Sequence, residues 1–184
     1  MVIFVKNENH PYILVFDIEF DKTVLVQFSG LLFKRVGEGV YQLASSCTQY
    51  VKHKPSYPFS QYTHIKKDFL ELNGVNIEDV VLTIKDDFIG DIDYKDILIV
   101  SHGLNNDRKI LKTNGIDFTE CDGWCTFQNG KRILNRDKNL KLDDIATEAG
   151  FYLDGAHNAY HDAWATVAVL TYLKKLEGEP KWDF

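Results

Sequence analysis

The sequence has few of the features that mark a secreted or membrane-bound protein. Its three cysteines are an odd number, which fits a reducing compartment better than a disulfide framework. No apolar run reaches the roughly 18–20 residues of a membrane span. The first residues also lack the basic region, long apolar stretch and cleavage site of a secretory signal. We therefore expect a cytoplasmic protein without a membrane partner.

Paired metal-binding cysteines and an excess of positive charge are also missing. Cys121 and Cys125 are spaced like a zinc half-site, but no second Cys or His pair follows at suitable spacing. The 27 acidic residues outnumber the 21 Lys and Arg residues, which gives a net charge of -6. This balance argues against broad electrostatic coating of nucleic acid, but it allows an enzyme that grips a few nucleotides.

The chain is long enough for one domain with a full-sized core. Of its 184 residues, 45% are hydrophobic and 26% are charged, an ordinary globular balance. We find no internal repeat or linker, and we expect one domain over residues 1–184.

Apolar patterning predicts an α/β fold. Three consecutive strands are expected at residues 12–20, 22–33 and 40–51, and Pro55 and Pro58 predict a loop after them. Short strands follow at 97–101 and 122–127, and helices are predicted at 67–72, 76–89, 106–114, 142–149 and 160–176. Antiparallel strands followed by βα units predict a mixed five-stranded sheet with helices on both faces.

Two acids end the first long apolar strand. Asp17 and Glu19 are two residues apart, so both side chains point to one face of the sheet. Ile13 and Val15 precede them on that face, which changes from apolar to acidic along the strand. Buried acids are costly unless compensated, and divalent cations are a common compensation. Two solvated acids on a surface strand are the alternative.

Two further acids and a histidine complete the pattern. Asp107 opens a helix after an apolar strand, where an acid also suits the helix dipole without any function. Asp162 opens the last helix and continues its buried stripe, so it also needs a compensating charge. His157 lies in the loop five residues earlier. Alone, each of these signals is weak, but together they indicate metal-assisted phosphodiester hydrolysis.

In this order and spacing the motifs resemble those of the DEDDh 3′→5′ exonucleases, whose fold is RNase H-like. The family has Asp-x-Glu on its first strand, a second Asp at a helix start, and His-x(4)-Asp near the C-terminus. The matching residues here are Asp17, Glu19, Asp107, His157 and Asp162. The resemblance covers nearly the whole chain and also relates it to RNA-trimming exonucleases and to the epsilon subunit of DNA polymerase III.

The resemblance implies a two-metal mechanism on single-stranded RNA or DNA. Asp17, Glu19, Asp107 and Asp162 would hold two Mg²⁺ or Mn²⁺ ions, and His157 would act as the general base. The products would be nucleoside 5′-monophosphates released from the 3′ end. His161 also neighbours Asp162, but the family spacing selects His157.

The chain departs from the family where substrate binds. Phe20 follows Glu19 where many members have Thr, and we expect its ring to stack on a nucleotide. His102 and Asn106 are further candidates for binding substrate. The motif Ser101-His102-Gly103 resembles versions found in RNA-trimming members.

Two other functional classes fit the same residues less well. One is a small-nucleotide phosphodiesterase or phosphatase, which would need no cleft for an extended strand. The other is a catalytically silent nucleic-acid-binding module, against which the intact acids and histidine argue. A polymerase-associated proofreading role is also less favoured, and we expect a stand-alone enzyme, since the sequence shows no obvious extension beyond Phe184 to hold a polymerase.

Overall fold

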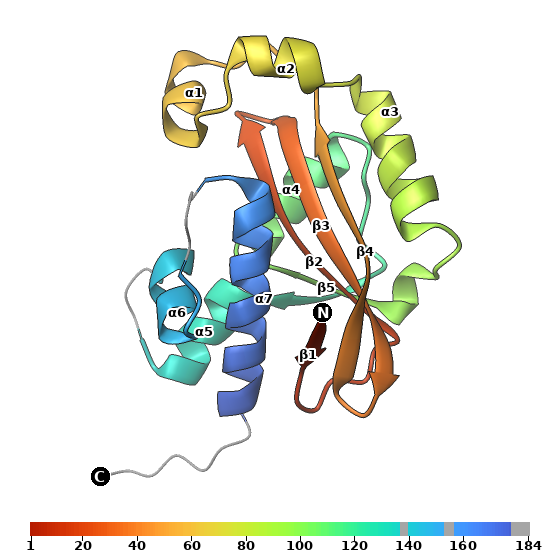
Figure 1. The fold of residues 1–184 in the computed structure, drawn as a ribbon, viewed down its shortest axis with the longest axis vertical. Helices are drawn as coiled ribbons and strands as arrows, with labels where there is room; N and C mark the ends of the chain where they lie inside the picture. The colour runs from red at the N-terminus through yellow and green to blue at the C-terminus, as the bar shows by residue number, and fades with distance from the viewer. Residues whose placement is uncertain (137–139, 153–156, 178–184) are drawn as a thin grey trace.

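A mixed sheet is the centre of the fold. A computed structural model describes residues 1–136, 140–152 and 157–177. Within them, the strands are ordered β1-β4-β3-β2-β5-β6 (Figure 1). Their bounds are β1 (Val2–Phe4), β2 (Tyr12–Asp21), β3 (Val24–Gly37), β4 (Val40–Tyr50), β5 (Ile97–Ser101) and β6 (Asp122–Cys125). Central β2 pairs antiparallel with β3 and parallel with β5, so the sheet changes from antiparallel to parallel there.

The predicted α/β class and mixed sheet are confirmed, but the prediction of five strands is wrong. The sheet has a sixth strand, β1, which pairs antiparallel with β4. This strand is only three residues long, too short for an alternating pattern to stand out in the sequence. The predicted last strand is also shorter than expected, because it ends at Cys125.

The helices follow the predicted order with two additions. Their bounds are α1 (Tyr57–Thr63), α2 (Lys67–Asn73), α3 (Ile77–Leu82), α4 (Leu104–Thr113), α5 (Thr126–Leu134), α6 (Leu142–Glu148) and α7 (Ala159–Leu176). A π-helical segment, η1 (Thr83–Ile89), continues α3, and a 3₁₀ turn, η2 (Tyr94–Asp96), precedes β5.

The two additions are α1 and α5. The prolines predicted to mark a loop instead flank the start of α1, where Ser56 caps the helix and Pro58 lies in the first turn. Proline is tolerated there because the first N–H groups of a helix have no intrahelical partner. Thr126 and Phe127 begin α5 and do not extend β6.

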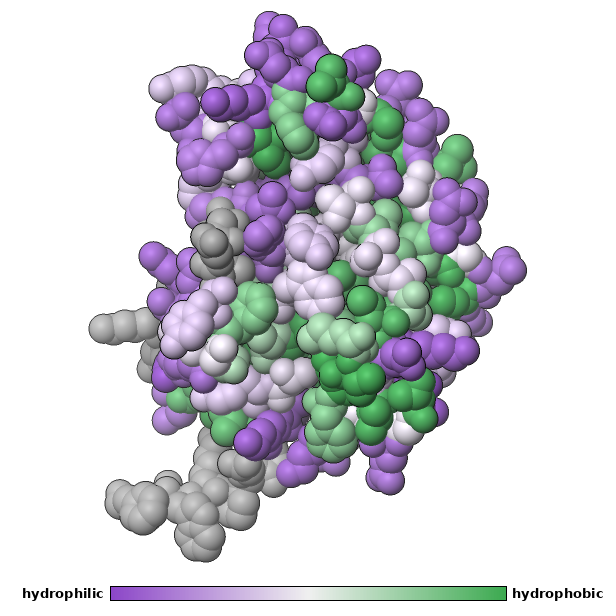
Figure 2. Space-filling view, in the orientation of Figure 1, coloured by the Kyte–Doolittle hydropathy of each residue, from purple (hydrophilic) through white to green (hydrophobic). Residues whose placement is uncertain are grey.

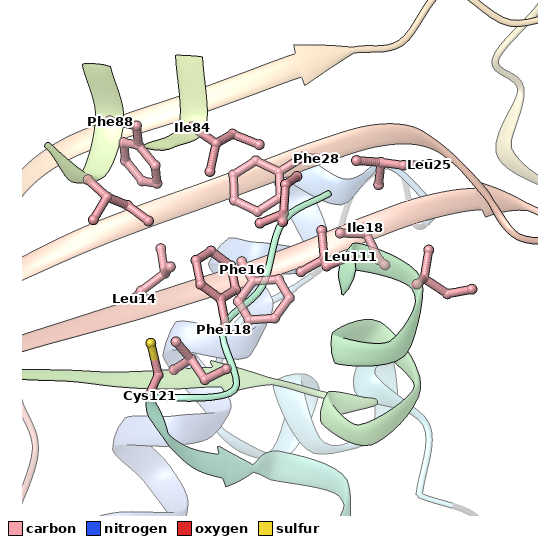
Figure 3. Packing of buried hydrophobic residues seen from close by; sticks show 14 of the residues in the cluster. Leu14, Phe16, Ile18, Leu25, Phe28, Ile84, Phe88, Leu111, Phe118 and Cys121 are labelled. Atoms are coloured by element: carbon pink, nitrogen blue, oxygen red, sulfur yellow. The ribbon is translucent and has the colours of Figure 1, made fainter. Parts of the chain in front are cut away.

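Each face of β2 belongs to a different core layer. Ile13 and Val15 pack with Val167 and Leu170 of α7. Leu14, Phe16 and Ile18 point to the opposite face, where they meet side chains from η1 and α4 (Figure 3). Phe16 stacks on Phe28 of β3 with ring centroids 6.1 Å apart. Helices therefore cover both faces of the sheet, as predicted, and α7 covers the face that carries the acids.

The surface changes character along the molecule. Figure 2 shows mostly hydrophilic residues over α1 and α2, and hydrophobic residues gathered towards the other end of the same face. Val2 and Phe4 of the edge strand β1 are exposed apolar residues. Among the helices of the described residues, none combines the length and apolar character needed to cross a bilayer.

Candidate active site

The two acids of β2 lie on the face of the sheet covered by α7. Asp17 pairs with Ser29 of β3, and Glu19 pairs with Gln27, before a bulge at Glu19/Phe20. Ser29 and Gln27 are both fully buried polar residues. The apolar face formed by Ile13 and Val15 therefore becomes polar on both β2 and β3, as the sequence predicted for β2.

The start of α7 is fastened to this polar patch. The buried Gln27 side chain donates a hydrogen bond to Asn158 Oδ1 at 3.3 Å and accepts one from the Ala159 N–H at 3.3 Å. Asn158 is the N-cap of α7, where its Oδ1 also accepts from the Tyr160 N–H. These bonds fix the first turn of α7, and with it Asp162, against β3.

Three of the predicted carboxylates converge. One oxygen from each of Asp17, Glu19 and Asp162 lies within 4.8 Å of the others. Asp162 Oδ1 is buried and has no hydrogen-bond partner among the described residues. A buried, unpaired carboxylate oxygen is costly unless a cation compensates it. A donor set made only of oxygens suits hard cations such as Mg²⁺ or Mn²⁺, so these residues fit divalent metal ions.

Crowding and burial make the acids weak when no cation is bound. Burial, followed by the charges of Asp107, Asp162 and Glu19, raises the pKa of Asp17 well above its ordinary value. Burial, followed by the neighbouring carboxylates, raises the pKa of Glu19 to about 8. Burial also raises the pKa of Asp162 to about 6, although the His157 N–H opposes this change. A positive charge among these groups would reverse these shifts.

Asp107 lines the same cavity but stands slightly apart from this group. It lies in the first turn of α4, which begins two residues earlier than predicted, at Leu104. Its Oδ2 accepts a hydrogen bond from the buried Ser101 hydroxyl at 2.6 Å. Burial raises the pKa of Asp107, and the bonds from Ser101 and Gly103 counter part of that increase. The structure thus places Asp107 beside the other acids, oriented by the last residue of β5.

His157 lies directly before the N-cap of α7. Its backbone has a φ of 67°, a left-handed conformation that is uncommon outside glycine. Its N–H donates to Asp162 Oδ2 at 3.2 Å, so the histidine and the last acid are joined locally. Its imidazole ring lines the cavity shared with the acids.

The cavity has a volume of about 630 Å³ and collects residues from distant parts of the chain. All five predicted catalytic and metal-binding residues line it. Residues that sequence reasoning missed also line it: Tyr62, Phe127, Leu140, Lys141 and Asp143. No motif marks these five, because they come from α1, α5, α6 and the residues beside them, and only the folded chain brings them together.

The predicted substrate-binding residues have different placements. Phe20 is half-buried and packs against the core on the far face of the sheet, outside the cavity lining. Asn106 is exposed on α4 and is also outside that lining. His102 does line the cavity, and both of its ring nitrogens are engaged, by Thr126 Oγ1 and by the Leu140 carbonyl oxygen, each at 2.9 Å. Burial lowers the pKa of His102, which favours a neutral ring in the cavity wall.

The family model of the RNase T exonucleases matches residues 35–170 of the chain. The chain belongs to this exonuclease family. The resemblance to DEDD-type exonucleases is thereby confirmed at the level of the family. The matched segment contains Asp107, His157 and Asp162, whereas Asp17 and Glu19 precede it.

Solved structures of exonuclease I and of a cell-death related nuclease share the fold. The chain is similar to E. coli exonuclease I in complex with a dT13 oligonucleotide, with a TM-score of 0.69 and 17% identity, over 90% of this chain and 41% of that one. A moderately thermophilic exonuclease I from Methylocaldum szegediense matches with a TM-score of 0.66 and 17% identity. The match covers 92% of this chain and 41% of that one. Cell-death related nuclease 4 (CRN-4) matches with a TM-score of 0.67 and 14% identity. The match covers 89% of this chain and 63% of that one. The chain spans about two fifths of the length of exonuclease I. No curated protein sequence matches it.

Proposed function

We propose that this protein is a metal-dependent 3′→5′ exonuclease that shortens single-stranded nucleic acid, and that residues 1–184 form one exonuclease domain. The observation that carries the proposal is the convergence of Asp17, Glu19 and Asp162 beside the imidazole of His157. One buried oxygen of Asp162 has no partner in the part of the chain that the structure describes. Exonuclease I structures that hold dT13 and dA16 oligonucleotides support a single-stranded substrate.

The four acids and the histidine would divide the work. Asp17, Glu19, Asp107 and Asp162 would hold two Mg²⁺ or Mn²⁺ ions. When bound, such ions activate a water molecule and offset the negative charge that develops on the phosphate and the leaving oxygen. His157 would accept the proton of the attacking water, a role open to an imidazole near neutral pH.

The reaction balances with water as the only co-substrate. The water oxygen bonds to phosphorus, the bond from phosphorus to the 3′ oxygen breaks, and a proton reaches that oxygen. The products are a nucleoside 5′-monophosphate and a strand that is one residue shorter, with a free 3′ hydroxyl. The ring of Phe127 in the cavity lining offers a stacking surface for a base without sequence readout.

The test uses 5′-labelled single-stranded RNA and DNA of equal length with Mg²⁺ or Mn²⁺. We expect a ladder that shortens from the 3′ end, disappears with EDTA and is lost in His157→Ala. His161→Ala is the matched control, because His161 is exposed on α7 and outside the cavity lining. Equal ladders from wild type and His157→Ala would remove His157 from the mechanism. Comparing the two polymers also tests whether the enzyme prefers RNA, as its Ser101-His102-Gly103 motif suggests.

A small-nucleotide hydrolase is the competing function, since it could use the same acids. Its signature would be faster turnover of a dinucleotide than of a long oligomer. A folded protein that binds Mn²⁺ but cleaves neither substrate would instead indicate a silent binding module.

A further inference from the structure

The ring of Tyr62 lies against the ring of His157. The two centroids are 3.8 Å apart, and the ring planes meet at 36°. Tyr62 is on α1, almost one hundred residues before His157, and its side chain is 61% exposed. Because this tyrosine is exposed and contacts an imidazole in the cavity lining, its ring does not serve to pack the hydrophobic core.

His157 has few other constraints on its side chain. Its backbone is held by the bond to Asp162, but no hydrogen bond from the described residues reaches its ring nitrogens. A free nitrogen is needed to accept a proton, yet a ring without partners can rotate away from the attacking water. Packing against a neighbouring ring restricts rotation and leaves both nitrogens free.

Helix α1 is itself fixed to the end of β2. Asp21, two residues after Glu19, is buried and accepts from the Ser56 N–H at 2.6 Å and from the Ser56 hydroxyl at 2.9 Å. Ser56 is the N-cap of α1, where its Oγ also accepts from the Phe59 N–H. The strand that carries two of the acids therefore also sets the position of Tyr62.

The charges around Tyr62 favour a neutral ring. Burial, followed by the carboxylates of Glu19, Asp162 and Asp143, raises the pKa of the Tyr62 hydroxyl. The phenol therefore stays protonated at neutral pH, and it does not compete with His157 as a base.

We propose that Tyr62 is a positioning residue whose ring holds the His157 imidazole over the carboxylates, with α1 anchored to β2 through Ser56 and Asp21. This inference rests on the proposed function, in which His157 is the general base. It assigns the ring of Tyr62 a role in the rate of the chemical step, separate from binding of the nucleic-acid strand.

Kinetics of Tyr62→Ala and Tyr62→Phe test the proposal on an oligonucleotide and on a nucleoside 5′-phosphate nitrophenyl ester, which has no strand to bind. Tyr62→Ala should lower kcat about two- to tenfold on both substrates with little change in KM. Tyr62→Phe keeps the ring and should restore kcat. A raised KM confined to the oligonucleotide would overturn the proposal and make Tyr62 a strand-binding residue.

A double variant separates this inference from the proposed function. In a His157→Ala background, Tyr62→Ala should cause no further loss of residual turnover; a full additional loss would contradict positioning through His157. If His157→Ala alone turns over substrate as fast as wild type, His157 is not the general base. That result contradicts the proposed function, whatever the effect of Tyr62→Ala.

Nuclear magnetic resonance provides a readout that is independent of turnover. The imidazole C–H signal of His157, assigned by its absence in His157→Ala, should move downfield in Tyr62→Ala and stay in place in Tyr62→Phe. An unmoved signal in Tyr62→Ala would show that the rings do not stack.

Discussion

Asp162 shows how much a single residue contributes to this site. It lies in the first turn of α7 among buried alanines, with one oxygen bonded to the His157 N–H and the other unpaired among the described residues. Removing its charge relieves a desolvation cost, but it also removes a donor for a cation. Stability and activity should therefore respond in opposite directions.

We expect Asp162→Asn to abolish metal-dependent cleavage while the metal-free protein unfolds at the same or a higher temperature. The amide has nearly the same shape and no charge to bury. Activity assays and thermal unfolding with and without Mn²⁺ would measure both effects, and the Mn²⁺-induced rise in Tm should shrink. Asp144→Asn, an exposed change on α6 outside the cavity lining, is the matched control. Full activity in Asp162→Asn would contradict a role in holding metal.

At the scale of elements, the connection between β3 and α7 depends on one buried amide. Gln27 joins the N-cap Asn158 and the Ala159 N–H to the sheet at the pairing position of Glu19. This connection was not predicted, because a polar residue inside a strand gives no indication of its distant partner.

Gln27→Met should remove these bonds and leave the Ala159 N–H without its side-chain partner. We expect a loss of about 1–3 kcal/mol in the free energy of unfolding, together with reduced kcat, because Asp162 would no longer be fixed. Denaturant unfolding and steady-state kinetics would measure the two effects. Gln42→Met, on the exposed side of β4, makes the same chemical change and should alter neither. Unchanged kcat in Gln27→Met would show that α7 keeps its position without this amide.

The contact between β3 and η1 requires a glycine. A Cβ added at Gly30 would lie 2.8 Å from Phe88 Cε1 and 2.9 Å from Phe28 Cε1, closer than packed carbons approach. Gly30→Ala should therefore cost about 1–3 kcal/mol of unfolding free energy, measured with denaturant. Activity of the folded fraction should persist, since these rings lie on the face away from the acids. Gly37→Ala is the control, because its added Cβ would contact only Val40, at an ordinary distance of 3.5 Å. Equal losses of unfolding free energy in the two variants would argue against crowding at Gly30.

The elements that the sequence predicted best are those with strong periodicity. Strand β2 is apolar on both faces and α7 carries a long buried stripe, so both were identified near their actual bounds. Helices α1 and α5 were not predicted, and both are short. Pro58 indicated a loop where α1 begins, and the predicted strand at 122–127 extended into the first residues of α5. The acids and His157 could be predicted to share a site from their motif spacing. Tyr62 could not, since its contact with His157 depends on the path of α1.

At the scale of the whole molecule, the acidic group couples stability to pH. The ordinary pKa of glutamate is 4.5, and in the folded protein that of Glu19 is about 8. Folding therefore favours the protonated form, so the stability it contributes is complete at low pH and is lost as pH rises through 8. Asp162 adds the same trend at lower pH, because folding raises its pKa from 3.8 to about 6.

We expect the Tm of the metal-free protein to fall as pH rises from about 5 to about 8. Glu19→Gln should flatten the part of this trend above pH 6, because the amide does not ionise. Saturating Mn²⁺ should raise the Tm of wild type more at pH 8 than at pH 6, because binding requires ionised carboxylates. A Tm of the metal-free protein that rises across this range would contradict the assigned pKa directions.

The proposed site also depends on the order in which the chain is made. Two of its acids are at positions 17 and 19, the third is at 107, and the last, with its histidine, is beyond position 156. A chain still on the ribosome lacks both His157 and Asp162 until α7 has emerged and docked on β3. A nascent chain that stops before α7 therefore carries three of the acids but no complete site, however much of the sheet has already formed.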